Sequence, residues 1–143
     1  MIRLICAIVV AGVAAAPLTL PQALRAHVTG ERFQVVTSIR GLPLGVRDEL
    51  QELFGQSLDI VDPGAPPSAS GRRLIAAGCS MDHCFVYYER GGAARSWRVA
   101  LFHWTPAATR FEWGGVAPSG LKSIDEVVNA AMSGTIDGPA SSW

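Results

Sequence analysis

Two cysteines near the middle of the chain bound the segment whose residue types suit chemistry best. The segment reads Gly78-Cys-Ser-Met-Asp-His-Cys84, so Cys79 and Cys84 enclose four residues. Thiolates, a carboxylate and an imidazole are all metal-ligand types, and His103 would add another. Zinc sites usually space their cysteines by two to four residues and bring a second ligand pair, which this sequence lacks. Redox-active thiol pairs favour Cys-x-x-Cys at a helix N-terminus, a spacing that Cys79 and Cys84 do not have. We therefore expect no metal and no cofactor.

The N-terminal residues decide how these cysteines are interpreted. Arg3 precedes an uncharged run from Leu4 to Ala16. As a helix this run would be about 20 Å long, short of the ~30 Å hydrocarbon core of a membrane. A basic start, a short apolar centre and small residues are typical of a secretory signal. We predict a signal peptide and short leader over residues 1–26, cleaved between about residues 15 and 26. An uncleaved N-terminal anchor is the alternative.

Export makes a disulfide the simplest use of the remaining cysteine pair. If Cys6 leaves with the signal, Cys79 and Cys84 remain as an even pair in an oxidising compartment. Closing so small a ring would raise the free energy of unfolding by about 2 kcal/mol, through the lower chain entropy of the unfolded state. Its larger effect would be to hold the enclosed residues in one shape, namely Ser80, Met81, Asp82 and His83. We expect the protein to be periplasmic or secreted, with no stable membrane insertion after cleavage.

Length and composition predict one small domain, which we place at residues 27–143. The chain has 143 residues, of which 49% are hydrophobic, and 12 basic residues balance 12 acidic ones. Zero net charge argues against nucleic-acid binding, which normally needs a basic excess. The sequence contains no nucleophile elbow, phosphate-binding loop, dinucleotide fingerprint or His-Glu-x-x-His motif. We therefore do not expect an enzyme. An enzyme would need a pocket lined by Glu89, His103 and Glu112. The positions of these residues in the sequence do not require such a pocket.

Hydrophobic patterning predicts an α+β fold, a mostly antiparallel sheet of about five strands with helices packed on it. Strands are expected at 32–39, 73–78, 84–89, 96–104 and 110–113, with a shorter one at 58–61. Helices are expected at 44–54, ended by Gly55, and from Ser123 to the stop at Gly134. In the strand at 96–104, alternation assigns one face to Trp97, Val99, Leu101 and His103. The other face takes Arg98, Ala100, Phe102 and Trp104.

The cysteine-bounded segment resembles the family of periplasmic inhibitors of vertebrate lysozyme. Members of that family carry a disulfide-closed loop of the same length, Cys-x-x-His-Asp-Cys, preceded by Gly. The likeness covers residues 72–143, including the closing helix with Ser133-Gly134-Thr135 and an aromatic C-terminus. The resemblance implies an antiparallel sheet with packed helices and a homodimer. It also implies inhibition of a lysozyme-type glycosidase by a loop that occludes the active-site cleft.

This chain departs from the family in the order of two loop residues. Asp82 precedes His83 here, so by position the inhibitory histidine of the family corresponds to Asp82. An imidazole is the better donor to a glycosidase's catalytic carboxylates. We therefore expect His83 to bind a carboxylate and Met81 to fill an apolar subsite. Two alternatives stay open: a stapled hairpin whose polar residues only face water, and an exported binding or structural module of the same fold that inhibits nothing.

Overall fold

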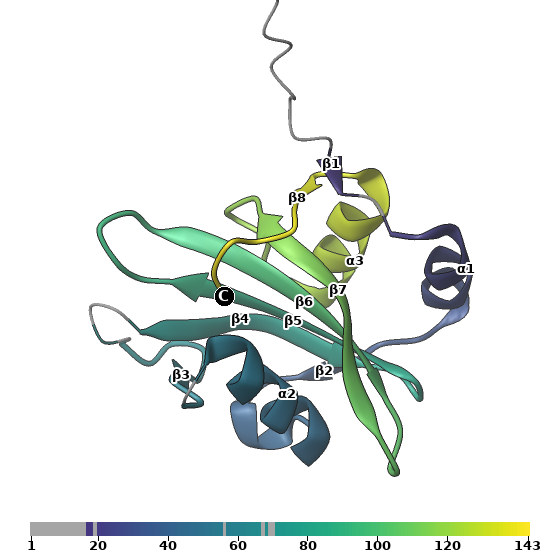
Figure 1. Ribbon diagram of the computed structural model, residues 1–143, viewed down its shortest axis with the longest axis horizontal. Coiled ribbons are helices and arrows are strands. Elements are labelled where there is room, and N and C mark those ends of the chain that lie inside the picture. The colour runs from purple at the N-terminus through teal and green to yellow at the C-terminus, as the bar shows by residue number, and fades with distance from the viewer. Residues whose placement is uncertain (1–16, 19, 56, 67, 69–70) are drawn as a thin grey trace, which may run out of the picture.

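The computed structural model describes residues 17–18, 20–55, 57–66, 68 and 71–143 (Figure 1). The predicted signal run at 4–16 lies outside the described residues. The helices are α1 (Gln22–Gly30), a 3-10 turn η1 (Ile39–Gly41), α2 (Leu44–Phe54) and α3 (Ile124–Ser133). The strands are β1 (Pro17–Leu18), β2 (Gln34–Val36), β3 (Ile60–Val61), β4 (Arg72–Cys79), β5 (His83–Arg90), β6 (Ser96–Trp104), β7 (Thr109–Ala117) and β8 (Ile136–Asp137).

The strands of the described residues form one sheet in the order β1-β8-β7-β6-β5-β4-β2, with β3 paired to β4 outside this path. Every pairing is antiparallel except that of β3 with β4. The predicted α+β class is confirmed, but the sheet has eight strands instead of about five. The four long strands β4 to β7 are joined by hairpins, and the short strands widen the sheet at its edges.

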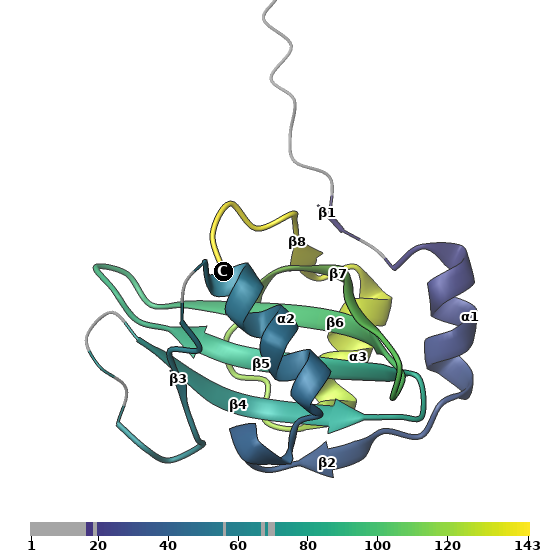
Figure 2. The same cartoon turned by 60° about the horizontal axis from the view of Figure 1, so that its bottom comes forward.

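Helices cover both faces of the sheet. Figure 2 shows α2 in front of the sheet, α3 behind it and α1 at one end. On the α2 face, Val46 and Leu50 pack with Val86 and Phe102. On the other face, α1 and α3 pack over a second cluster that includes Phe85 and Leu101. Because neighbouring strand residues point to opposite faces, a central strand between two helical layers is buried on both sides.

The predicted alternation along β6 is confirmed for its apolar residues. Trp97, Val99 and Leu101 belong to the cluster under α1 and α3. Ala100, Phe102 and Trp104 belong to the cluster under α2. β5, paired to β6 along its whole length, is buried from His83 to Glu89. Strand β5 is therefore the centre of the molecule.

Both predicted helices are present with their expected ends. α2 ends at Gly55, whose φ of 97° is favourable for glycine. α3 begins after Ser123, whose side-chain oxygen accepts a hydrogen bond from the backbone N–H of Glu126 at 3.2 Å. It ends at Gly134 in the left-handed conformation. The capping signals in the sequence thus locate these helices to within a residue or two.

Other elements differ from the sequence-based expectation. The predicted strand at 32–39 is a three-residue strand, β2, followed by the 3-10 turn η1. We expected a strand to stop before Gly114 and Gly115, but β7 runs through both. It does so because these glycines let β7 approach the backbone of its neighbours closely. Helix α1 was not expected at all. The apolar stripe of α1 is only two buried residues, Leu24 and Val28.

Residues before 27, which we assigned to the leader, also contribute to the core. β1 pairs with β8, and the side chains of Leu20 and Leu24 are buried in the core. A cleavage after Ala15 or Ala16 would leave this segment intact. A cleavage near residue 26 would remove both leucines from the core. Within the described residues, no helix combines the length and apolar character needed to cross a membrane.

The C-terminal residues are tied to the sheet by arginines. Arg72 donates to the carbonyl oxygen of Trp143 at 2.6 Å, and Arg98 donates to that of Ser142 at 2.7 Å. Burial lowers the pKa of the Arg98 guanidinium and raises the pKa of the neighbouring Tyr88 phenol. The phenol therefore stays neutral. The C-terminal tail lies across the α2 face, with the Trp143 ring edge-on to that of Phe111.

The close approach at Gly114 predicts that Gly114→Ala destabilises the protein. An added Cβ would lie 2.3 Å from the carbonyl oxygen of Val99 and 3.0 Å from the Trp143 ring. Backbone would have to move, so the free energy of unfolding should fall by about 1–3 kcal/mol in urea titrations. Gly30→Ala is the matched control, since its Cβ would meet nothing within 4 Å. Equal stability of the two variants would contradict the described packing of β7.

Candidate functional site

The cysteine-bounded loop, residues 79–84 (the Cys loop), is the tight turn between β4 and β5. Cys79 and Cys84 are opposite each other in the strand register and form a disulfide, with their Cα atoms 4.1 Å apart. The disulfide predicted from the cysteine count is therefore confirmed. The backbone N–H of Ser80 also donates to the carbonyl oxygen of His83 at 2.7 Å. The turn is thus closed by a covalent bond and by a hydrogen bond.

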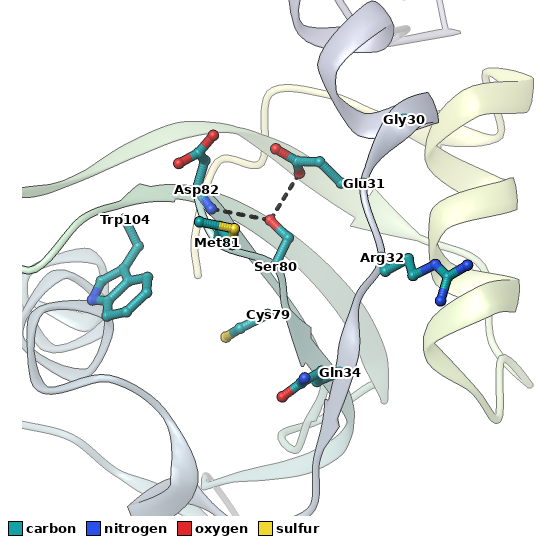
Figure 3. A pocket seen from close by; sticks show the side chains of 9 residues that line it. All are labelled: Gly30, Glu31, Arg32, Gln34, Cys79, Ser80, Met81, Asp82 and Trp104. Carbon is teal, nitrogen blue, oxygen red and sulfur yellow. Dashed lines mark hydrogen bonds between the residues drawn. The ribbon is translucent and has the colours of Figure 1, made fainter.

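Ser80 organises the interior of the Cys loop. Its hydroxyl oxygen accepts from the backbone N–H of His83 at 2.9 Å and from that of Asp82 at 3.2 Å. The same hydroxyl donates to the Glu31 carboxylate at 2.8 Å. Figure 3 shows this serine between Glu31 and Asp82. Outside the loop, the backbone N–H of Trp104 donates to the Asp82 carbonyl at 2.7 Å, which links the turn to β6.

The four enclosed residues divide into an outer and an inner set. Met81 and Asp82 project into solvent, and Met81 is 87% exposed. His83 is only 4% exposed, and its Nδ1 lies 2.9 and 3.1 Å from the two Glu31 carboxylate oxygens. A carboxylate only accepts, so Nδ1–H is the donor. The imidazole of His83 therefore faces the protein interior, and the tip of the loop consists of Met81 and Asp82.

A hollow adjoins the Cys loop on the side of β2. Its volume is about 570 Å³, and its walls include Gln34, Met81 and Trp104 (Figure 3). Glu31 and Arg32, which follow α1, also line it. The hollow is mixed in character, with an indole and a thioether beside charged and amide groups. It extends the exposed surface at the loop tip.

The other side of the loop carries a group of side chains that we call the histidine cluster: His27, His83, His103 and Glu112. The His83 and His103 ring centroids are 5.3 Å apart, and those of His83 and His27 are 6.2 Å apart. Of the residues considered for an enzyme pocket, the structure brings His103 and Glu112 together. Glu89 lies at the opposite end of β5, paired with Arg73 and Arg95.

Sequence reasoning missed Glu31 and His27. Both come from the segment around α1, at or close to the predicted leader, and neither belongs to a recognisable motif. The available signal was that the chain has three histidines, of which His103 lies on a predicted strand and His83 directly precedes the predicted strand at 84–89. The contact of Glu31 with the loop joins residues far apart in the sequence, which local patterning does not reveal.

Comparisons with protein-family models, with curated proteins and with solved structures find no match for this chain. The resemblance to the lysozyme-inhibitor family thus depends on the Cys-loop spacing and the flanking segments alone.

The hydrogen bonds of Ser80 predict that Ser80→Ala loosens the loop while the disulfide stays closed. Two backbone donors and the Glu31 carboxylate would lose a partner in a partly buried position. We expect the free energy of unfolding to fall by about 1–3 kcal/mol and the amide of His83 to exchange faster with solvent. Hydrogen exchange followed by NMR measures this directly. Ser141→Ala, at an exposed serine, is the control, and an unchanged His83 amide in Ser80→Ala would refute the assigned role.

Proposed function

We propose that the protein is an exported protein-binding module that occludes the active-site cleft of a lysozyme-type glycosidase with the tip of its Cys loop. The observation that carries the proposal is the 87% exposure of Met81 at the end of a turn that a disulfide closes. A large apolar side chain carried on a closed turn and exposed to water has much apolar area to bury against a partner. A preorganised loop also binds without a large ordering cost.

The position of His83 changes the contacts that such a loop would make. Its imidazole is oriented inward by Glu31, so the sequence-based role as donor to a catalytic carboxylate would require the ring to leave the interior. Met81 and Asp82 remain as the contact residues. Met81 would enter an apolar subsite of the cleft. The Asp82 carboxylate would be repelled by catalytic carboxylates and would favour cationic groups on the cleft rim.

Occlusion needs no chemistry from this chain. A glycosidase brings two carboxyl groups and its substrate together in a cleft, and a rigid turn seated between them excludes the sugar. The hollow beside the loop, with Trp104 on its wall, would supply further contact area around the tip. The family resemblance supports the choice of a glycosidase as partner. The alternative is an exported module whose loop binds a different protein and inhibits nothing.

Lysis of a peptidoglycan suspension by an animal lysozyme tests the proposal. The purified protein should slow lysis in a dose-dependent manner. Met81→Ala should weaken the inhibition at least about tenfold, as expected for an anchor that buries a large side chain at the centre of an interface. Leu44→Ala is the matched control, because Leu44 is also a largely exposed apolar residue, 64% accessible, at the start of α2.

Two further results separate the alternatives. Cys79→Ser combined with Cys84→Ser should abolish inhibition while the far-ultraviolet circular dichroism shows a retained fold. Absence of inhibition by the folded wild-type protein at a large molar excess would contradict the glycosidase proposal and favour a different partner. Equal inhibition by Met81→Ala and Leu44→Ala would contradict the assignment of the loop tip.

A further inference from the structure

The three histidines of this chain gather at one place. His27 lies on α1, His83 begins β5 and His103 is near the end of β6. His83 and His103 are direct partners in the antiparallel register, so their rings project from the same face of the sheet. Only His83 is buried, His103 is half-buried and His27 is exposed, so the three imidazoles extend from the interior to the surface, each with ring nitrogens available to a ligand.

A β-bulge brings a carboxylate into the same group. In the pairing of β6 with β7, Phe102 faces Phe111 and Leu101 faces Trp113, so Glu112 is the extra residue. A bulge redirects the side chain of its strand. Here the ligand atoms of Glu112, His83 and His103 all lie within 4.8 Å of one another. Two imidazoles and a carboxylate thus converge at distances that a single ion could bridge with small side-chain rotations.

Glu31 orients the central imidazole for coordination. Its carboxylate accepts from Nδ1 of His83, which leaves the lone pair of Nε2 available. Metal-binding histidines almost always donate their second ring N–H to a carboxylate or carbonyl in this way, and the partner fixes the tautomer and raises the basicity of the ligand. The Glu31–His83 pair is therefore a second feature, independent of the clustering, that is typical of a metal centre.

The group opens onto a cavity of its own. This cavity, about 340 Å³ in volume, is lined by His27 and Asp82 as well as by the three converging residues. Arg110 also lines it and pairs with Glu112 at 2.7 Å. Since the Arg110 side chain is mostly exposed, it can turn outward and release the carboxylate. The coordination position that faces the cavity is thus open to water.

We propose that His83, His103 and Glu112 bind a divalent transition-metal ion of the zinc class, with Glu31 as the positioning residue of His83. Two neutral imidazoles and one carboxylate suit Zn²⁺, whereas Ca²⁺ and Mg²⁺ prefer oxygen-only sets. Three protein ligands with a fourth position toward a cavity are the pattern of sites that hold a water or a small ligand. This site lies behind the loop tip and does not depend on the proposed inhibition.

Calorimetric titration of the purified, metal-stripped protein with ZnCl₂ tests the proposal. The wild type should bind one equivalent of Zn²⁺. His103→Ala and Glu112→Gln should each weaken binding at least about tenfold, with circular dichroism confirming the fold of each variant before titration. Glu52→Gln is the matched control, since it makes the same chemical change at an exposed glutamate of α2, on the opposite face of the sheet. Its affinity should equal that of the wild type.

Either of two results would overturn the proposal. One is a folded wild-type protein that binds less than one equivalent or binds with a dissociation constant above about 1 mM, a free energy weaker than about −4 kcal/mol. The other is wild-type affinity in Glu112→Gln and His103→Ala, which would assign the binding to surface groups elsewhere. A weakening in Glu52→Gln equal to that in Glu112→Gln would likewise count against this site.

Discussion

The burial of β5 on both faces is the constraint on which the rest of the structure depends. A strand in the middle of a sheet with helices on either side sends successive side chains into two different cores. Cys84 therefore enters the cluster under α2, and His83 enters the space under α1. Because their side chains lie on opposite faces of the sheet, the two residues have different roles. The cysteine closes the turn, and the histidine becomes an interior ring that needs a polar partner. Glu31, at the end of α1, supplies that partner and also binds Ser80. The loop tip and the histidine cluster are thus the two sides of one strand terminus.

The same constraint explains which groups remain available to a partner. With His83 turned inward, a short turn between two hydrogen-bonded strands has only Met81 and Asp82 left to project. Rigidity comes from the disulfide, from the hydrogen bonds of Ser80 and from the link between Trp104 and Asp82. A partner that contacts this tip meets a fixed shape.

A ligand of the histidine cluster instead meets an opening between α1 and the ends of β6 and β7. The proposed binding loop and the proposed metal site are therefore adjacent but face different surroundings.

Much of the fold was predictable because it depends on local signals. The helix start after Ser123, the stop at Gly55 and the alternation of apolar residues along β6 each require only a few neighbouring residues, and all are found as expected. The Cys79–Cys84 disulfide, expected from the even number of cysteines left after the predicted signal peptide, is present. The features that the sequence did not predict depend on long-range packing. Helix α1 has a narrow apolar stripe and lies in a segment assigned to the leader, so its burial becomes evident only against the sheet. The contact of Glu31 with His83 depends on how the end of α1 packs against β5, and the bulge that redirects Glu112 depends on strand register. The sequence pattern specifies neither.

The two ring nitrogens of His83 show directly whether Glu31 orients this ring in the protein interior. Long-range ¹H–¹⁵N correlation spectra of the three histidines, in the wild type and in Glu31→Ala, distinguish the tautomers. We predict that Nδ1 of His83 carries a proton that exchanges slowly with solvent, and that this protection is lost in Glu31→Ala, which has no side-chain acceptor. A His83 ring whose Nδ1 is unprotonated, or whose signals match those of a freely exposed imidazole, would contradict this orientation of His83 by Glu31.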